Sequence, residues 1–266
     1  MKSICLLIIL FVLIISSCER QAAQKEVFET QNSIIVIYDN NEFYPELETG
    51  WGFSCVIKLK NKNILFDTGA DSPTLLSNME KLGIRPEEID IIVLSHMHSD
   101  HTGGLDGFLN ENSNVTVYLP ASFPNSIKNR IIAAGAKYVE IGNSSKIMEN
   151  VYSTGELGTG IIEQSLIIET EKGLVVITGC AHPGIVNIVR ASKELLNKDI
   201  YLVLGGFHLG STTDAEIGNI INSFRSLGIE KAGPCHCSGD RARDLFKQEY
   251  KEDYIEIGVG KIIEIK

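Results

Sequence analysis

The order of strand and helix patterns along residues 33–266 limits the possible folds more than any other feature. Three short β-branched runs joined by polar turns come first, at 33–39, 53–59 and 63–69. Strands and helices then alternate, two further strands follow each other directly, and alternation resumes until the end. Because each sheet must cover its apolar faces, this order predicts an α/β fold with two sheets packed face to face and helices outside.

Individual elements follow from apolar periodicity and from turn residues. The first three strands should form an antiparallel meander, and the runs at 165–170 and 174–180 should form a hairpin. The first helix is expected to have Ser72 as N-cap, Pro73 as its first helical residue and Gly83 as terminator. The stretches 39–52 and 142–164 are expected to be loops. Further helices are predicted at 124–135, 184–197, 214–228 and 239–250, and further strands at 90–95, 115–120, 200–206, 229–237 and 260–266.

The N-terminal stretch MKSICLLIILFVLIISSCER is typical of an export signal. A lysine precedes an apolar run over 4–15, which is shorter than the roughly 20 residues needed to span a bilayer. The ending ISSC resembles the bacterial lipobox, so we predict a lipoprotein signal peptide over 1–17 and a lipid anchor at Cys18. A polar tether over 18–32 and a single domain over 33–266 would follow. This organisation predicts an exported lipoprotein of the cell envelope, periplasmic or on the outer surface; a buried core helix is the alternative for the apolar run.

The net charge of the chain restricts the kinds of molecule that the protein is expected to bind. The formal net charge is −10 and the sequence pI is about 5.1. Phosphate backbones are bound by clustered lysines and arginines, so this balance argues against nucleic acid as a partner. A small-molecule substrate is expected instead, with membrane association through the lipid anchor.

Three of the six histidines lie within six consecutive residues, in the stretch LSHMHSDH. His96 and His98, two apart in extended chain, should point to the same side. Asp100 and His101 fall in the turn that opens the next short helix, where the chain can curl back toward them. Imidazoles and a carboxylate form a ligand set suited to zinc or iron, so the stretch predicts a metal site.

This H-x-H-x-D-H motif after a buried strand resembles that of the metallo-β-lactamase superfamily, and FDTG at 66–69 resembles the superfamily's first motif. The resemblance implies a four-layered αβ/βα sandwich of two mixed sheets, packed face to face with helices outside, and one or two metal ions in a cleft at one edge of the sheets. It also implies that His96 and His98 bind the first metal and that Asp100 and His101 bind the second. Asp67 would orient the site through hydrogen bonds.

The remaining histidines, His182, His208 and His236, each follow a predicted buried strand. Loops after such strands gather at one edge of an α/β sheet, where ligand sites form. We therefore add His182 and His236 to the predicted metal ligands. The sequence departs from the superfamily pattern in two places: GIIEQ stands where many members have a third metal histidine, and Cys180 stands where they have a bridging aspartate.

The segments EQSLII, GCAHPGIVNIV, GGFHL and PCHCSG resemble a narrower branch of the superfamily, labelled dihydropterin ribofuranosylaminobenzene phosphate synthase. Many bacterial members carry that label without the pathway. The resemblance implies a metal site and a hydrolase-like mechanism, and we do not carry the synthase reaction over to a predicted envelope lipoprotein.

Four cysteines lie beyond the predicted lipid site. Cys180 could be a thiolate metal ligand, a nucleophile activated by His182, or a small buried residue. Cys235 and Cys237, if extended, would project opposite to His236, and they could form a disulfide with Cys180 or with Cys55.

The leading hypothesis is a metal-dependent hydrolase that uses a metal-activated water on an ester or phosphoester of a small molecule, and not a true β-lactamase. One or two divalent ions are expected, with zinc favoured and iron or manganese as alternatives. Asp100 would orient the water or accept its proton, and His208 would donate a proton to the leaving group or contact the oxyanion. The alternatives are a di-iron redox enzyme of the same fold, a non-catalytic ligand-binding or sensing lipoprotein, and a metal-independent thiol hydrolase that uses Cys180 and His182.

Overall fold

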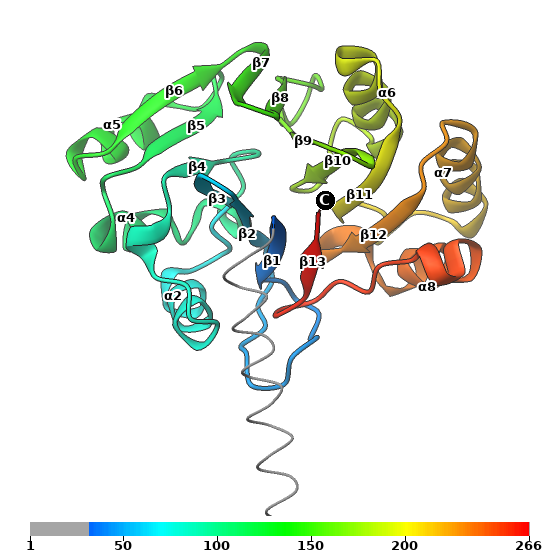
Figure 1. The fold of residues 1–266 in the computed structure, drawn as a ribbon, viewed down its shortest axis with the longest axis horizontal. Coiled ribbons are helices and arrows are strands. Elements are labelled where there is room, and N and C mark those ends of the chain that lie inside the picture. The colour runs from blue at the N-terminus through cyan, green and yellow to red at the C-terminus, as the bar shows by residue number, and fades with distance from the viewer. Residues whose placement is uncertain (1–31, 266) are drawn as a thin grey trace, which may run out of the picture.

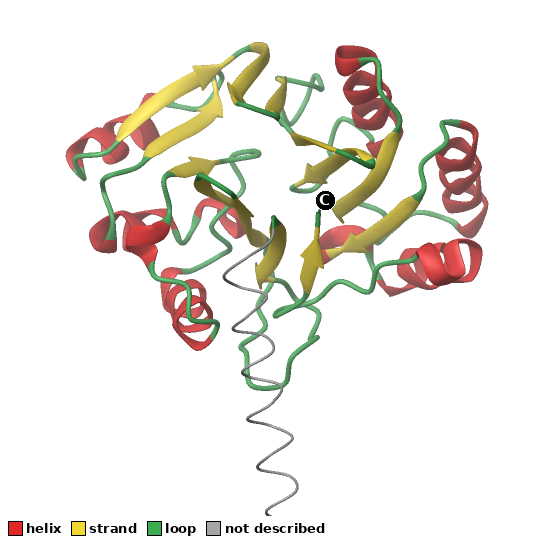
Figure 2. Ribbon diagram, in the orientation of Figure 1, coloured by secondary structure: helices red, strands yellow, loops and turns green. Residues whose placement is uncertain are grey.

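A computed structural model of the protein describes residues 32–265, and two β-sheets form its centre (Figures 1 and 2). The first sheet has seven strands in the order β13-β1-β2-β3-β4-β5-β6. Its β1, β2 and β3 pair antiparallel, as the predicted meander requires, and β3 to β6 run parallel. The strands are β1 Ser33–Tyr38, β2 Ser54–Leu59, β3 Lys62–Phe66, β4 Ile91–Val93, β5 Thr116–Pro120, β6 Lys137–Ile141 and β13 Ile262–Glu264.

The second sheet has six strands in the order β12-β11-β10-β9-β8-β7. The predicted hairpin is present as the antiparallel pair β9 and β10, while β10, β11 and β12 run parallel to one another. Parallel strands end at the same edge of a sheet, so the loops after these three strands meet there. The strands are β7 Asn143–Met148, β8 Val151–Gly155, β9 Leu166–Thr170, β10 Gly173–Thr178, β11 Ile200–Gly206 and β12 Lys231–Cys235.

Helices cover the outer face of each sheet, as Figure 1 shows: α2, α4 and α5 on the first sheet and α6, α7 and α8 on the second. The helices are α2 Ser72–Lys81, α3 Ser99–Thr102, α4 Leu105–Glu111, α5 Asn125–Ala133, α6 Ile185–Leu196, α7 Asp214–Ser226 and α8 Asp240–Tyr250, with 3-10 turns η1 Pro86–Glu88, η2 His236–Ser238 and η3 Lys251–Asp253. The predicted layer order of two sheets inside and helices outside is confirmed.

Three apolar clusters hold the layers together. The central one packs the inner faces of the two sheets against each other, with residues such as Val36, Phe66, Val175 and Leu204 fully buried. Two further clusters join each sheet to its own helices. Burying one such side chain contributes about 1.5–3 kcal/mol, so the sheets form a rigid platform for the loops at their edge.

The start of the first helix differs from the expectation. Its N-cap is Asp71, whose carboxylate accepts a hydrogen bond from the backbone N–H of Thr74 at 2.8 Å. The prediction of Ser72 was therefore one residue late, and Pro73 is the second helical residue. Asp71 also accepts a bond from the hydroxyl of Tyr38 at 2.7 Å, which ties the cap to β1. The ionised carboxylate of Asp71, which accepts hydrogen bonds from Thr74 and Tyr38, is a stronger cap for α2 than the hydroxyl of Ser72.

The expected loop over 142–164 was wrong in its first half, which forms the hairpin β7 and β8. β7, at the edge of the second sheet, has the polar sequence NSSKIM and mostly exposed or partly exposed residues. Edge strands of this kind lack the apolar alternation by which a strand is recognised. β4 is also shorter than expected and ends at Val93, although the backbone N–H of Leu94 still donates to the carbonyl of Tyr118 in β5 at 2.9 Å.

The predicted signal peptide and nearly all of the predicted tether lie outside the described residues. Among residues 32–265, no helix combines the length and the apolar character that a membrane span requires.

Candidate metal centre

The histidine-rich loop starts where β4 ends and runs into the single turn of α3. His96 Nε2 and His98 Nδ1 lie 3.1 Å apart, so the two side chains do point to the same side. The turn of α3 then directs Asp100 and His101 back toward them, with the rings of His96 and His101 4.2 Å apart. One short segment thus brings four metal-capable groups together.

His182 joins the first two histidines from the loop after β10. One nitrogen from each of His96, His98 and His182 lies within 4.8 Å of the others. The rings approach edge to face, at 4.8 Å and 4.9 Å from His182 to His96 and His98. We call these three residues the first cluster.

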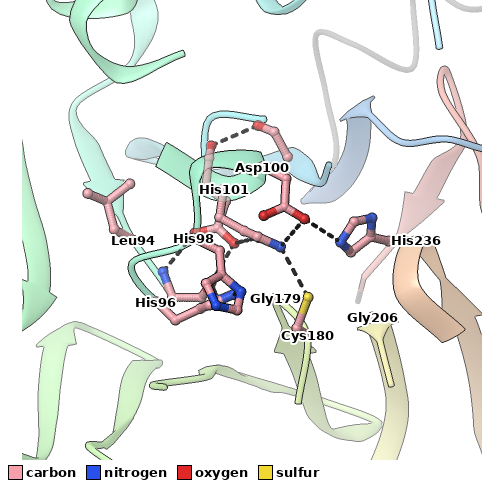
Figure 3. Close-up of polar contacts among 12 residues, drawn as sticks. Leu94, His96, His98, Asp100, His101, Gly179, Cys180, Gly206 and His236 are labelled. Carbon is pink, nitrogen blue, oxygen red and sulfur yellow. Dashed lines mark hydrogen bonds and ion pairs between the residues drawn. The ribbon is translucent and has the colours of Figure 1, made fainter. Parts of the chain in front are cut away.

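A second group of ligand atoms adjoins the first. Asp100, His101, Cys180 and His236 each offer an atom within 4.8 Å of the others. Asp100 Oδ2 lies 3.4 Å from His236 Nε2 and 3.7 Å from His101 Nε2, and Cys180 Sγ lies 3.2 Å from the same His101 nitrogen (Figure 3). We call these four residues the second cluster.

The donor atoms fit a divalent metal. The Nε2 atom of His182 is buried and has no hydrogen-bond partner among the described residues, and the buried Nε2 atom of His236 has only its 3.4 Å contact with Asp100 Oδ2. A buried polar atom without a partner costs about 1–3 kcal/mol, and coordination would remove that cost. Three imidazoles in one cluster, and imidazoles with a carboxylate and a thiol in the other, are donors that zinc and iron accept.

Buried partners fix the orientation of the ligands. His101 Nδ1 lies 2.7 Å from Asp67 Oδ2, and Asp67 also accepts bonds from the hydroxyl of Ser95 at 2.6 Å and from its backbone N–H at 2.7 Å. His236 Nδ1 lies 3.0 Å from Asn40 Oδ1. These contacts leave the Nε2 atom of each imidazole to face the cluster, which is the usual arrangement of a metal-binding histidine. Asp67 thus lies where the motif resemblance places it, whereas Ser95 and Asn40 were not predicted.

Glu163 is the most important residue that the sequence analysis missed. Its fully buried carboxylate accepts hydrogen bonds from consecutive backbone N–H groups: Oε1 from Gly179 at 3.1 Å and from Cys180 and Ala181 at 2.9 Å, and Oε2 from His182 at 2.9 Å. The loop that carries two cluster residues is therefore wrapped around one carboxylate. The sequence did contain a signal for Glu163: the segment GIIEQ departs from the superfamily pattern by having an acidic residue where many members have a metal-binding histidine.

Backbone strain concentrates at the site. Asp67, Ala181, His208 and His236 have φ of 54°, 59°, 54° and 47°. Non-glycine residues rarely adopt these angles, which persist only where surrounding contacts impose them. The fold therefore holds these loops in conformations that they would not adopt alone.

The electrostatics of the two clusters favour metal ligation. Burial, followed by the neighbouring imidazoles, lowers the pKa of His96 far below its ordinary value and that of His182 to about 4. Burial opposes ionisation of Asp100, but its contact with His236 and the charge of His101 lower its pKa to about 2. At His101, burial lowers the pKa of the imidazole, but the negative charge of Asp67 and its hydrogen bond outweigh this effect and raise the pKa. At neutral pH His96 and His182 thus keep proton-free nitrogens, and Asp100 is ionised.

The cysteines separate into two groups. All four described cysteines are free thiols, with Cys55 and Cys235 fully buried in the apolar core. Cys180 Sγ contacts His101 and not His182. The structure therefore does not contain the contact through which His182 was expected to activate the thiol. η2 replaces the extended conformation assumed around His236, and it places Cys237 beside Cys180, with the Cys237 thiol donating to the Cys180 carbonyl at 3.7 Å.

Open space adjoins the first cluster. A cavity of about 450 Å³ is lined by His182, Pro183, Asn187 and the loop 157–161. His208 is exposed, and its ring lies 4.4 Å from that of His182. On the other side, Trp51 is 60% exposed and its ring lies 5.0 Å from that of His236. The clusters therefore lie at a surface with room for a small molecule.

The family comparison agrees with this geometry. Residues 52–192 match the model of the metallo-β-lactamase superfamily, a segment that includes the H-x-H-x-D-H motif. The chain belongs to the metallo-β-lactamase superfamily. Members of this superfamily typically bind divalent metals, in keeping with the two clusters.

Individual relatives refine the comparison. The chain is 32% identical over 262 residues to a 7,8-dihydropterin-6-methyl-4-(β-D-ribofuranosyl)-aminobenzene-5′-phosphate synthase from Methanocaldococcus jannaschii, covering 80% of this chain and 89% of that protein. It is 28% identical over 144 residues to an N-acyl homoserine lactonase from Bacillus cereus, covering 50% and 56%. A solved metal-dependent hydrolase of the β-lactamase superfamily is 32% identical and superimposes with a TM-score of 0.74, covering 88% of this chain and 98% of its own. The resemblance to the synthase branch is thereby confirmed.

Proposed function

We propose that the protein is a metal-dependent hydrolase that cleaves an ester or phosphoester of a small molecule. The observation that carries this proposal is the convergence of two adjoining ligand clusters, His96, His98 and His182 in one and Asp100, His101, Cys180 and His236 in the other. We assign one divalent ion to each cluster, with zinc favoured because a thiol is among the donors.

A divalent ion held by these ligands would supply a bound water whose pKa falls toward about 7 and would withdraw electrons from the attacked carbonyl or phosphoryl group. Asp100 is only partly buried and its pKa is low, so it is ionised and can orient that water or accept its proton. His208 is exposed beside the first cluster, where it can donate a proton to the leaving group or contact the oxyanion. The cavity beside His182 would hold the substrate.

The size of that cavity supports a small substrate. Its volume of about 450 Å³ lies within the usual range of small-molecule sites, roughly 300–1,000 Å³. Its lining of Leu157, Ile161, Pro183 and small polar residues contains no lysine or arginine. We therefore place carboxylic esters and lactones beside phosphoesters in the test. The name of one relative includes a lactone and the name of the synthase relative includes a 5′-phosphate ester.

The test is a panel of phosphodiester, phosphomonoester, lactone and thioester substrates, assayed with purified protein whose metal content has been measured. We expect turnover of at least one class, loss on chelation and recovery when zinc is returned. Asp100→Asn should lower kcat, by roughly 10²–10⁴-fold for a lost acid–base group. Asp106→Asn, which alters an exposed carboxylate paired with Arg130, is the matched control and should retain activity.

Chelator resistance would contradict the proposal and would favour the thiol hydrolase. One contact makes that alternative specific: Cys180 Sγ adjoins His101, which in turn adjoins Asp67. Cys180 is only 3% exposed, however, and its neighbour Cys237 together with burial raises its pKa. A thiol that is almost inaccessible and keeps its proton is poorly suited to attack a substrate. A bound metal ion would itself remove that proton, so we favour the role of Cys180 as a ligand.

A further inference from the structure

We infer that Cys180, His208 and Cys237 form a third, thiolate-rich metal site beside the two clusters. The two-cluster proposal leaves Cys237 without a role and gives His208 only a role in contacting the substrate. The two sulfur atoms and one histidine nitrogen lie within 4.8 Å of one another. They come from three separate loops, after β10, after β11 and within η2.

The donor set matches a soft metal ion. Two thiolates and one imidazole are a known ligand combination for zinc, and thiolates also select copper(I). Cys180 belongs to both the second cluster and this group, so its sulfur would bridge two ions. His208 is exposed, whereas Cys180 is buried and Cys237 is partly buried. An ion could therefore enter from the His208 side, which leaves room for a further ligand from solvent.

The chain makes space for the two sulfurs at Gly206, the last residue of β11. A Cβ atom at this position would lie 2.7 Å from Cys237 Sγ and 3.2 Å from the Cα of Cys180. A side chain there would collide with both cysteines and with the carbonyl oxygen of Gly179, which would lie 2.3 Å from the Cβ atom. The thiols are not joined in a disulfide: Cys237 donates to the Cys180 carbonyl at 3.7 Å, and Cys180 Sγ lies 3.2 Å from His101 Nε2.

The loops that carry His208 and Cys237 are fastened to each other. The backbone N–H of Phe207 donates to the buried hydroxyl of Ser238 at 2.9 Å. A Cβ atom at Gly239 would lie 2.7 Å from the Cα of Gly210, so the two loops touch backbone to backbone at that point. His208 is held at a φ of 54°, a strained angle for a histidine. The three donors are thus preorganised and do not depend on chance contacts of mobile side chains.

The experiment counts ions bound to the full, reduced protein. Wild type, Cys237→Ser, His208→Ala and the control Cys55→Ala are dialysed against zinc, and bound metal per chain is measured by elemental analysis. The same proteins loaded with cobalt(II) are examined for sulfur-to-metal charge-transfer absorption. Circular dichroism verifies that each variant is folded, and His208→Ala, which alters an exposed side chain, should fold normally.

We expect Cys237→Ser and His208→Ala each to bind one ion fewer than wild type while retaining the ions of the two clusters. Cys237→Ser should also lose about two thirds of the charge-transfer absorption, because wild type would have two sulfur–metal bonds from the bridging Cys180 and one from Cys237, and only the bond of Cys180 in the second cluster would remain. Cys55→Ala should match wild type in both readouts. Equal metal counts and equal absorption in wild type and the two site variants would overturn the inference. Because neither readout depends on turnover, failure of the hydrolase proposal would be seen separately, in the substrate panel.

Discussion

Replacing Glu163 by glutamine tests how the second half of the site is held in place. In the wild-type protein the Glu163 carboxylate accepts four hydrogen bonds, from the backbone N–H groups of residues 179–182. Glutamine has nearly the same size, but one of its terminal atoms is an NH₂ group that donates. At least one backbone N–H, that of His182 if the amide nitrogen replaces Oε2, would then face another donor in a fully buried position.

The magnitude follows from the bonds that are lost. One hydrogen bond to a charged group contributes about 1.5–3 kcal/mol, and the remaining ones would weaken by roughly half when the acceptor becomes neutral. Removing a buried charge offsets part of this loss, since burial raises the pKa of Glu163 even against its four donors. We expect Glu163→Gln to lower the free energy of unfolding by about 2–4 kcal/mol. Because His182 is displaced, metal affinity should fall about 10–100-fold.

Two assays check this expectation. Urea unfolding of the metal-free protein gives the free energy of unfolding, and competition with a chelating dye gives the metal affinity. Glu171→Gln removes an exposed carboxylate in the turn between β9 and β10, and it should stay within about 0.5 kcal/mol of wild type. If Glu163→Gln behaved like Glu171→Gln in both assays, the role assigned to the buried carboxylate would be refuted.

Three further perturbations probe other parts of the structure. Asp71→Ala removes the cap of α2 and should lower the free energy of unfolding by about 1–2 kcal/mol, seen as a lower thermal midpoint, whereas an unchanged midpoint would contradict the cap assignment. Gly179→Ala would place a Cβ 2.2 Å from Ser95 Oγ and 3.0 Å from Asp67 Oδ2; we expect a loss of about 1–3 kcal/mol and weaker metal binding, and wild-type affinity would count against the packing described. Trp51 is the only tryptophan and adjoins His236, so cobalt(II) should quench its fluorescence; His236→Ala should reduce the quenching, and equal quenching in both proteins would place the ion elsewhere.

The sequence predicted those features that depend on short-range patterns. Apolar periodicity located ten of the thirteen strands in the described residues and missed β6, β7 and β8. The spacing of His96, His98, Asp100 and His101 predicted that these four side chains converge, as they do. The position of His182 and His236 after buried strands was enough to place them at the same edge, because parallel strands end together. For these residues the local pattern and the fold agree.

The features that were missed depend on contacts between distant segments. Glu163 became important only once the fold brought it under the loop 179–182. Asp71 was preferred as the cap because Tyr38, from a remote strand, also binds it. The proximity of Cys180 and Cys237 required the turn η2, which a strand pattern continuing to residue 237 did not indicate. The helix, strand and turn propensities of a short segment do not indicate which distant segments it will contact in the fold.

Anomalous diffraction from crystals of the metal-loaded protein, recorded at the absorption edge of the bound metal, tests the central claim most directly. The account predicts one anomalous peak among His96, His98 and His182 and another among Asp100, His101 and His236. An anomalous map without a peak in either cluster, from protein shown by elemental analysis to contain metal, would contradict it.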